Sequence, residues 1–330
     1  MNTRVSVLKA HGSQNDILIV QGRPGDHAAE ADVPRLVSRL CDRSGPLGAD
    51  GVYFVDLAPA VPQAAFFNPD GSFAKLCGNG MRCLARLVLD TRDEQQAVVR
   101  AGGADFVVRR AESTAEGVRQ TAVEMPRIDF APAEPVVTGA QPHIDTPLPA
   151  LHPTLGLTAL AVPNDHLVAV VEKFDEDELV ATGQRISAAT DVVPRGANLS
   201  FIHPLDDGEI YVQTYERGAG LTRSCGSGVV ASRAVYSRLG LAAPGERITV
   251  RNPGGVAVAW LAGEPSAWHA TLQGNASYVY RAEVDLTALG AGEPTRIETD
   301  AFVDEIEAFA RAREDNLAVL DAAGVHPSVG

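Results

Sequence analysis

Hydrophobic and polar residues alternate along the chain over short stretches that end in turn-forming residues, a pattern typical of β-strands. Residues 4–12 (RVSVLKAHG) alternate in this way, GSQND provides a turn, and the apolar run ILIVQ follows at 17–21. These segments predict a β-hairpin at the start of the chain. Further strands are expected at 51–57, 63–69, 96–102, 104–111, 121–126, 157–172 (two strands joined by a turn), 198–205, 209–218, 247–255, 256–263, 268–274 and 277–286.

Apolar residues at helical spacing interrupt this series of strands. The segment 32–44 has Pro34 near its start and Gly45 just beyond its end, as helices commonly do. Short turns such as GRPG are interpreted as turns and nothing more. Helical spacing also predicts helices at 81–92, 175–187 and 225–241, and an appended amphipathic helix at 299–324.

Pro and Gly residues gather in 129–147, between two stretches in which strands and helices follow a similar order. One short motif occurs in each stretch: CGNG ends the segment 68–80, and CGSG ends the segment 216–228, with the Cys at the same place in both. The pair Asn-Asp occurs at 15–16 and again at 164–165, at nearly the same separation. Two concordant landmarks favour an internal duplication, so we expect two similar domains that face each other.

Composition narrows the class of protein. The chain has 330 residues, 45% of them hydrophobic and 21% charged, which is ordinary for a globular protein with two cores. The net charge of −14 argues against nucleic acid and against an anionic membrane as partners, so local groups must hold an anionic substrate. The N-terminal sequence has no long apolar run, so we expect neither a signal peptide nor a membrane span, and a cytoplasmic location.

The repeated motif has a chemical meaning. Glycine after cysteine lets the backbone approach a ligand closely, and the free N–H groups of a helix start form an anion site. The positive helix end is expected to lower the pKa of Cys77 and of Cys225. Two such thiols on opposite faces of a carbon act as base and acid and invert a stereocentre, a reaction that needs no metal and no cofactor.

Other interpretations of the cysteines stay open at this point. Cys77 and Cys225 are alternatively buried structural thiols, or a disulfide if their Cα atoms lie within ~7 Å. A metal site is disfavoured because the chain has no C-x-x-C spacing and no Cys/His cluster. Cys41 and Cys83 lie on apolar helical stretches, where packing in the core is the simpler explanation.

Three polar residues also have two interpretations each. His166 follows PND inside an apolar stretch, where a lone histidine is usually structural, although beside a thiol it sets protonation states. Glu216 and Arg217, in YERGAG, form either a solvated pair at a strand end or part of the site.

With these residues in view, the sequence resembles the diaminopimelate epimerase family. The resemblance runs from about residue 5 to about residue 280. It implies an α+β (α/β-type) fold of two pseudo-symmetric domains, each a mainly antiparallel barrel-like sheet around a central helix, with the active site in the cleft between them. The expected division is an N-terminal half at 1–130 completed by a strand near 276–286, a C-terminal half at 131–275, and an appended helical tail at 287–330. The segments that carry the resemblance are KAHGSQNDILIV, CDRSGPLGADGV, FNPDGSFAKLCGNGMRCLARLV, VPNDHLVAVV, ANLSFI, YERGAGLTRSCGSGVVAS and VRNPGG.

The resemblance also implies residue roles. Cys77 and Cys225 would be the base and the acid, exchanging roles with the direction of reaction, and His166 and Glu216 would tune them. The family converts LL-diaminopimelate to the meso form for lysine and peptidoglycan precursor synthesis, so it implies a small amino-acid substrate, no metal, no cofactor, a homodimer and a cytoplasmic location. Substrate polar groups would be held by Asn15, Asn68, Asn164, Asn198 and Arg217, and the reacting carboxylate by the backbones of Gly78, Asn79, Gly226 and Ser227.

The sequence departs from the family pattern in places. Asp165 stands where the family usually has Pro, Leu221 where it usually has an acidic residue, and Gly51 where some members have Gln. The tail after about residue 285 lies outside the resemblance. These departures leave two alternatives beside the epimerase: a racemase of another amino acid on the same two-cysteine scaffold, and a non-catalytic binding protein that uses the two thiols as a redox switch.

Overall fold

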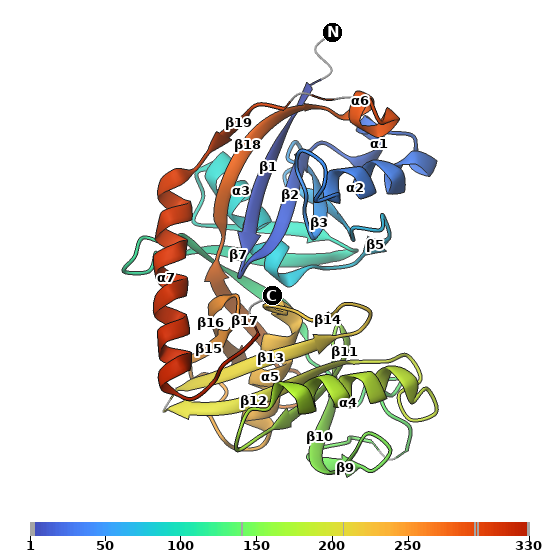
Figure 1. The fold of residues 1–330 in the computed structure, drawn as a ribbon, viewed down its shortest axis with the longest axis vertical. Coiled ribbons are helices and arrows are strands. Elements are labelled where there is room, and N and C mark those ends of the chain that lie inside the picture. The colour runs from blue at the N-terminus through green and yellow to red at the C-terminus, as the bar shows by residue number, and fades with distance from the viewer. Residues whose placement is uncertain (1–3, 140, 207, 294, 296, 329–330) are drawn as a thin grey trace. The chain divides into compact units, whose positions relative to one another are not determined.

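The chain divides into two units in this computed structural model (Figure 1). Unit 1 comprises Met1–Val123 and Gly274–Ala312, and unit 2 comprises Glu124–Gln273 and Arg313–Gly330. The structure describes residues 4–139, 141–206, 208–293, 295 and 297–328. The predicted limits at 130, 275 and 287 stay predictions; in the structure the segment predicted as a tail is shared between the units, and its residues 294, 296 and 329–330 lie outside the described ones.

Unit 1 is built on a mixed sheet in which antiparallel pairs predominate. β1 pairs antiparallel with β2, which confirms the predicted hairpin, and its other edge pairs with β18 from the far end of the sequence. β2 and β3 are parallel, as are β4 and β6. The strands are β1 (Arg4–Gly12), β2 (Asn15–Gln21), β3 (Gly51–Asp56), β4 (Gln63–Phe67), β5 (Phe73–Ala74), β6 (Gln96–Ala101), β7 (Ala104–Ala111), the first half of β8 (Gln120–Arg127), β18 (Ser277–Asp285) and β19 (Thr299–Ala301).

The helices of unit 1 lie at the two crossovers and at its C-terminal segment. α2 (Val33–Cys41) joins β2 to β3, and α3 (Gly78–Arg92) joins β5 to β6. α3 contacts strands from distant parts of the sheet, β1 and β2 as well as β6 and β7, so the sheet wraps around it (Figure 1). The remaining helices are α1 (Pro24–His27), the 3-10 helix η1 (Glu30–Asp32), α6 (Leu286–Ala291) and the first part of α7 (Val303–Ala322).

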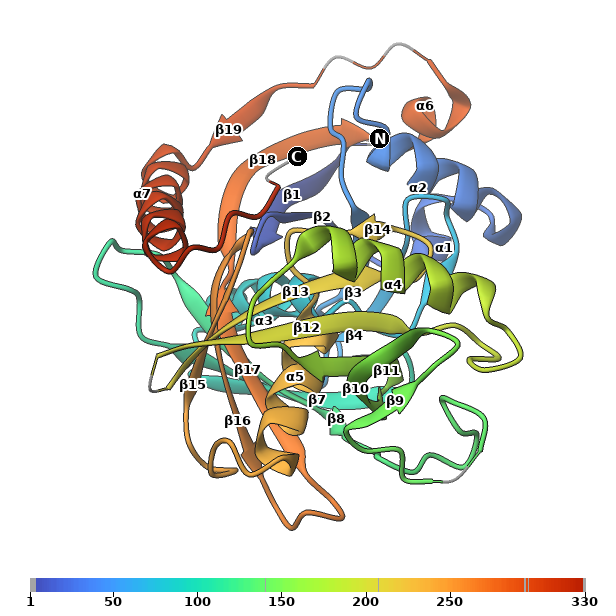
Figure 2. The same cartoon turned by 60° about the horizontal axis from the view of Figure 1, so that its bottom comes forward.

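Unit 2 repeats this order of elements. α4 (Glu176–Ala188) lies over β12 and β13, and α5 (Gly226–Arg238) contacts β10, β11, β12, β13 and β16 (Figure 2). The strands are β9 (Thr146–Leu148), β10 (His152–Val162), β11 (Asn164–Val170), β12 (Asn198–Asp206), β13 (Glu209–Glu216), β14 (Gly220–Leu221), β15 (Ile248–Asn252), β16 (Gly255–Ala262) and β17 (His269–Asn275).

The pairing order shows that the two units are duplicates in topology. In unit 1 the successive pairs from β1 to β7 run antiparallel, parallel, antiparallel, parallel and antiparallel, and β5 pairs with β4 alone. In unit 2 the pairs from β10 to β16 follow the same sequence, with β14 in the place of β5. The duplication predicted from the two motifs is therefore present in the fold, whereas barrel closure and a cleft between the halves stay predictions.

The structure corrects two local predictions. GRPG is not only a turn, because Pro24 starts the short helix α1 and the Asp26 carboxylate accepts a hydrogen bond from the Arg23 N–H at 2.7 Å. The segment after residue 287 is not only helical, because it also contains β19, which pairs antiparallel with β18. The appended helix itself is present as α7 and begins four residues later than predicted, at Val303.

Each unit has its own hydrophobic core. The core of unit 1 includes Leu18, Leu36, Val52 and Val284 and takes in Cys41, while the core of unit 2 includes Leu167, Leu179 and Phe201. Cys83 is fully buried on α3, and burial raises the pKa of Cys41 and of Cys83 to about 12. Both thiols therefore stay protonated and pack as small apolar groups, as expected.

Candidate functional site

The first motif places Cys77 at the N-cap of α3. Its backbone is extended (φ −119°, ψ 110°), and its Sγ accepts a hydrogen bond from the Gly80 N–H at 3.3 Å. Glycine is required at position 80 because an added Cβ would lie 2.8 Å from the Tyr53 ring. The cysteine thus takes the capping role that Ser or Asp usually has, with its sulfur held over the first turn of the helix.

Two neighbouring strands hold Cys77 in place. The Tyr53 hydroxyl, on β3, accepts from the Cys77 N–H and donates to the Cys77 carbonyl oxygen, both at 3.3 Å. Burial raises the pKa of Tyr53 well above its usual value, so this hydroxyl stays a neutral donor. The Cys77 Sγ donates to Asn15 Oδ1, at the start of β2, at 3.4 Å. The structure thus brings together two of the predicted site residues, Asn15 and Cys77.

A buried arginine lies behind this thiol. The Arg82 side chain, 1% exposed, donates to Asn79 Oδ1 at 3.0 Å, to Ser13 Oγ at 3.0 Å and to the Asn275 carbonyl at 3.1 Å. The Asn275 Oδ1 in turn accepts from the Ser13 N–H at 2.7 Å. These contacts fix the side chain of Asn79, one of the residues expected to hold the substrate carboxylate.

The second motif builds the same frame in unit 2. Cys225 is the N-cap of α5 with φ −115° and ψ 112°, and its Sγ accepts from the Gly228 N–H at 3.4 Å. An added Cβ at Gly228 would lie 2.5 Å from Thr214 Oγ1, so the close approach again requires glycine. Gly226 and Ser227 lie in the first turn, where N–H groups have no carbonyl partner within the helix.

Glu216 at the end of β13 approaches Cys225. Its Oε1 accepts from Thr222 Oγ1 at 2.7 Å, and a hydrogen bond joins the carboxyl to the Cys225 thiol. Burial raises the pKa of Glu216, and burial followed by the nearby Glu216 charge raises the pKa of Cys225 well above its usual value. The expectation that the helix start lowers the pKa was thus wrong for Cys225, because burial and a neighbouring carboxylate outweigh the helix dipole.

His166 is placed on the other side of the same frame. Its Nε2 lies 3.1 Å from Ser227 Oγ and 3.3 Å from Asn164 Oδ1, and Ser227 Oγ lies 3.5 Å from the Cys225 Sγ. The Nδ1 atom has no hydrogen-bond partner among the described residues. Burial, with a smaller contribution from Arg217, lowers the pKa of His166 to about 3. The ring is therefore neutral at physiological pH and reaches the thiol through Ser227.

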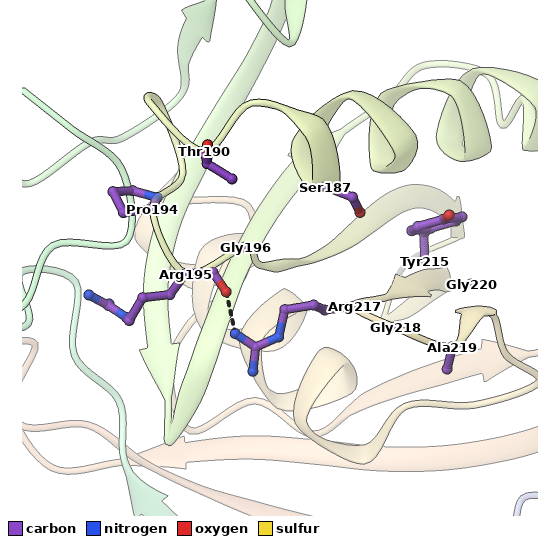
Figure 3. Close-up of a pocket in the computed structure, with 10 residues that line it drawn as sticks. All are labelled: Ser187, Thr190, Pro194, Arg195, Gly196, Tyr215, Arg217, Gly218, Ala219 and Gly220. Atoms are coloured by element: carbon purple, nitrogen blue, oxygen red, sulfur yellow. Dashed lines mark hydrogen bonds between the residues drawn. The ribbon is translucent and has the colours of Figure 1, made fainter.

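Arg217 belongs to a second cluster in unit 2. Its N–H donates to Asn198 Oδ1 at 2.9 Å, and its guanidinium donates to the Arg195 carbonyl. Arg195 is paired with Asp165 at 2.8 Å. Figure 3 shows the Arg217 side chain turned toward the Arg195 carbonyl beside a cavity of about 630 Å³. This cavity is lined by Ser187, Thr190, Pro194, Arg195, Gly196, Tyr215, Arg217, Gly218, Ala219 and Gly220.

The predicted site residues thus fall into three groups. Unit 1 brings Asn15 to Cys77, whereas the Asn68 amide donates to Ser72 Oγ within its own turn at 2.9 Å. In unit 2, Glu216 does not form the solvated pair with Arg217 that one interpretation suggested, because it turns to Thr222 and Cys225. The first group of unit 2 is Cys225, Ser227, His166, Asn164 and Glu216, and the second is Asn198 and Arg217.

Sequence reasoning missed Tyr53, Arg82 and Thr222. Tyr53 gave no signal, because it lies within an apolar strand pattern. Arg82 and Arg86 did give one: two arginines one turn apart follow CGNG on a helix whose other positions are largely apolar. Arginine is seldom buried unless polar groups pair with it. Two arginines among apolar helical positions therefore indicated a buried polar network beside CGNG.

Metal and redox features complete the description of the site. In the part of the chain that the structure describes, no group of three or more His, Cys, Asp and Glu side chains has metal-binding geometry. The four cysteines are free thiols. Among the same described residues, no helix is both long enough and apolar enough to span a bilayer.

Comparisons of sequence agree with one another. The family model for diaminopimelate epimerase matches residues 7–125 and 158–279. The diaminopimelate epimerase of Enterococcus faecalis is 36% identical over 86% of this chain and 90% of its own length. That of Listeria welshimeri is 33% identical over 92% of this chain and 97% of its own length.

Comparisons of structure identify the fold. A phenazine biosynthesis protein of the PhzF family from Bacillus anthracis superposes with a TM-score of 0.60 at 15% identity, covering 85% of this chain and 99% of that one. A hydroxyproline epimerase from Agrobacterium vitis, solved with trans-4-hydroxy-L-proline, gives a TM-score of 0.56 at 16% identity over 91% and 92% of the two chains. At such identities the likeness concerns the mixed α/β fold alone.

Proposed function

The chain belongs to the diaminopimelate epimerase family, and from that premise we propose that it interconverts LL- and meso-diaminopimelate by two-base proton transfer at the α-carbon. The proposal includes isomerase activity without a cofactor, in the supply of lysine and of peptidoglycan precursor. The observation that carries it is the repeated frame: each unit holds a thiol at the start of a helix, capped by the N–H three residues on.

In the proposed reaction, Cys77 and Cys225 approach the same α-carbon from opposite faces. One sulfur, as thiolate, takes the α-proton, and the other, as thiol, returns a proton to the opposite face, so the configuration inverts. The first thiolate becomes a thiol and the second thiol becomes a thiolate, which leaves the enzyme ready for the reverse direction. His166 and Glu216 tune the Cys225 side through the contacts to Ser227 and to the thiol itself.

The carboxylate beside the reacting carbon needs donors, because negative charge develops there as the proton leaves. The first-turn N–H groups of α3 and α5, at Gly78, Asn79, Gly226 and Ser227, are the proposed donors. Arg217, next to the cavity, is the proposed partner for a more distant carboxylate of the substrate. The remaining polar groups are assigned to Asn15, Asn68, Asn164 and Asn198.

A second candidate is a racemase of a different amino acid. It is supported by two residues of unit 2 that depart from the family pattern: the apolar Leu221 packs against the core of unit 2, and Asp165 is paired with Arg195. Gly220, the neighbour of Leu221, and Arg195, the partner of Asp165, both line the cavity. The non-catalytic alternative, a redox switch, has less support, because Glu216 and His166 surround Cys225 with groups suited to proton transfer.

One experiment separates these functions. The reduced protein is incubated in D₂O with LL- or meso-diaminopimelate, and deuterium at the α-carbon is followed by NMR. Incorporation together with interconversion of the isomers is the expected result. Exchange only on another amino acid selects the racemase, and no exchange on any amino acid, with thiols that oxidise reversibly, selects the switch.

Two further properties are proposed from family membership. The protein is expected to be a homodimer and to act in the cytoplasm. Analytical ultracentrifugation at micromolar concentration tests the first, with a mass near 69 kDa expected, about twice that of the 34.7-kDa chain. Fractionation of cells that produce the native protein tests the second.

A further inference from the structure

The turn between β1 and β2 has an unusual backbone. Gly12 and Asn15 pair across its base, and its two central residues, Ser13 and Gln14, have φ angles of 52° and 61°. A two-residue turn with positive φ at both positions is normally filled by Asn-Gly, because other side chains are strained there. Ser13 is also completely buried. Contacts from the surrounding residues must therefore stabilise a turn that its own sequence disfavours.

Asn275, in the C-terminal segment of unit 1, makes the shortest of these contacts. Its Oδ1 accepts a hydrogen bond from the Ser13 N–H at 2.7 Å. Its Nδ2 donates to the His11 carbonyl oxygen at 3.1 Å and to Ser277 Oγ at 3.0 Å. The side chain is 4% exposed, and both ends of its amide are engaged. Neither an apolar side chain nor a carboxylate offers this combination of donor and acceptor.

Two further contacts act on the same turn. The Arg82 guanidinium donates to Ser13 Oγ at 3.0 Å and to the Asn275 carbonyl oxygen at 3.1 Å. The Gln14 N–H donates to His11 Nδ1 at 3.4 Å. Burial lowers the pKa of His11 to about 4, so the ring is neutral at physiological pH and its Nδ1 is free to accept. The backbone N–H groups of both central residues are thus hydrogen-bonded.

The strand after the turn begins with a residue of the proposed site. Asn15 Oδ1 accepts a hydrogen bond from the Cys77 Sγ at 3.4 Å. In unit 2 the corresponding strand starts at Asn164 and follows a turn of one residue, Pro163, whose ring fixes its own φ. The turn of unit 1 has serine and glutamine instead, so its shape, and with it the direction of Asn15, depends on the side chains around it.

We propose that Asn275 is a positioning residue that holds Ser13 and Gln14 in the left-handed conformation. In that conformation the turn sets the Asn15 amide oxygen against the Cys77 thiol. The inference rests on the proposed function, in which Asn15 binds the substrate beside this thiol, and it adds a residue from the far end of the sequence to that site. The site of unit 1 is then complete only once β18, which follows Asn275, has paired with β1.

Alkylation of Cys77 measures this contact in the absence of any substrate. The hydrogen bond to Asn15 favours the protonated thiol, whereas iodoacetamide reacts with the thiolate. The rate is followed by mass spectrometry in a Cys225→Ser parent chain. Asn15→Ala removes the acceptor and is expected to speed modification of Cys77 about fivefold. Asn275→Ala is expected to give nearly the same rate, because the turn relaxes and Asn15 leaves the thiol.

Substitutions at position 14 separate the shape of the turn from general packing. Gln14→Gly removes the strain of positive φ, so the turn keeps its shape without the hydrogen bond to Asn275. Added to Asn275→Ala, it is expected to return the rate to within about twofold of the parent, and alone it is expected to change nothing. Gln14→Val disfavours positive φ and is expected to speed modification with Asn275 intact. Because position 14 is partly exposed, Gln14→Val also covers the case in which Asn275→Ala does not fold.

A matched control lies in unit 2. Asn316, 1% exposed, is a buried asparagine that donates to the Asn252 carbonyl oxygen at 3.1 Å and accepts from the Arg251 guanidinium at 3.2 Å. Asn316→Ala removes a side chain of the same kind and a similar set of contacts. The alkylation rate of Cys77 is expected to stay at the parent value.

An unchanged rate in folded Asn275→Ala, or in Gln14→Val, overturns the proposal. A fast rate in Asn275→Ala that Gln14→Gly fails to reverse also overturns it, as does an equally fast rate in Asn316→Ala, since both indicate a general loosening of the fold. The assay uses no amino acid, so its outcome is independent of the D₂O experiment. A negative exchange result on every amino acid overturns the proposed function, whereas alkylation decides the role of Asn275.

Discussion

The two cysteine frames share a backbone and differ in what surrounds the sulfur. Cys77 and Cys225 have dihedral angles within a few degrees of each other, and each accepts a hydrogen bond from the N–H three residues on. The sheet registers also match, so each residue around one thiol has a counterpart around the other. The two units therefore share a backbone arrangement: a helix start that presents a sulfur atom and free N–H groups together.

The strand residues beside the helices have diverged. His166 pairs with Asn198 across parallel strands in unit 2, and the matching pair in unit 1 is Ile17 with Gly51. Glu216 likewise corresponds to Asn68, nine residues before each cysteine. At these three places unit 2 therefore has a histidine, an amide and a carboxylic acid, whereas unit 1 has an apolar chain, a glycine and an amide.

The difference bears on the proposed mechanism, in which the same backbone frame serves once for the base and once for the acid. In that mechanism an acid and a base acting on one carbon differ in protonation at any moment, although they exchange roles in each turnover. In unit 2 burial and Glu216 favour the thiol form of Cys225, whereas in unit 1 the half-buried Cys77 thiol has the Asn15 amide oxygen beside it in place of a carboxylate. The asymmetry lies in the side chains, while the backbone stays duplicated.

Removing either sulfur is expected to have the largest effect on the rate of epimerisation. Cys77→Ala and Cys225→Ala are each expected to lower the rate of epimerisation by at least about a thousandfold, because a site with one thiol cannot invert the carbon. Chiral chromatography of the two isomers measures it. Cys83→Ala, on the same helix as Cys77 but buried in the core, is the matched control and should retain turnover. Inversion that persists in either first variant contradicts the two-thiol mechanism.

Changing Glu216 is expected to have the next largest effect. Glu216→Gln removes the carboxylate that bonds to Cys225 and should lower kcat about a hundredfold. Thr222→Val leaves the carboxylate but removes its 2.7 Å hydrogen bond, so a loss of about tenfold is expected. Steady-state kinetics at pH 7 measure both. A kcat for Glu216→Gln equal to that of the wild type refutes a tuning role.

Unit 2 has His166 where unit 1 has Ile17, so the stability of the fold is expected to depend on pH in the acid range. Burial lowers the pKa of His166 from 6.5 to about 3 in the folded chain, so below pH 6.5 the unfolded chain takes up a proton that the folded chain does not. The free energy of unfolding therefore falls as pH drops from 6.5 toward 3, by at most about 1.4 kcal/mol per pH unit from this group.

Urea unfolding at several pH values measures that slope. His166→Gln is expected to make the dependence shallower by that amount. His269→Gln removes an exposed histidine and serves as control, with no change of slope expected. The same slope in wild type and His166→Gln contradicts a buried neutral ring.

The smallest effect on catalysis is expected for Asp165 and for its counterpart Asp16. Each follows the asparagine that begins a strand, β11 or β2. Asp165→Asn breaks the pair with Arg195, whose carbonyl accepts a hydrogen bond from Arg217. Because Arg195 is partly exposed, the pair contributes less than about 1 kcal/mol, and KM should rise no more than about fivefold with kcat unchanged. Asp16→Asn is the counterpart in unit 1, where Lys9 and Arg43 are the partners. A fall in kcat for Asp165→Asn with KM unchanged contradicts this role.

Local sequence was enough to predict what the two frames share. The hairpin, the helices that follow CGNG and CGSG, and the duplicated order of strands all follow from patterns within a few dozen residues. Family resemblance added the residue roles, which stay proposals. Both kinds of inference concern positions close together in the sequence or matched to a known motif.

The differences between the frames needed the structure. Arg82 bonds to Ser13 and to Asn275, which the pairing of β1 with β18 brings together from opposite ends of the sequence. The raised pKa of Cys225 depends on burial, which a helix-start motif does not reveal. Long-range pairing and depth of burial are the two quantities that local patterns leave undefined.

The pairing of β1 with β18 has a consequence for biosynthesis. On the ribosome, the first strand to emerge waits for a partner that is translated only after all the strands of unit 2. The central sheet of unit 2 is complete earlier, so the second half of the chain is able to fold before the first half closes. Closing so long a loop is slow, and until then one edge of β1 is exposed to pairing with other chains.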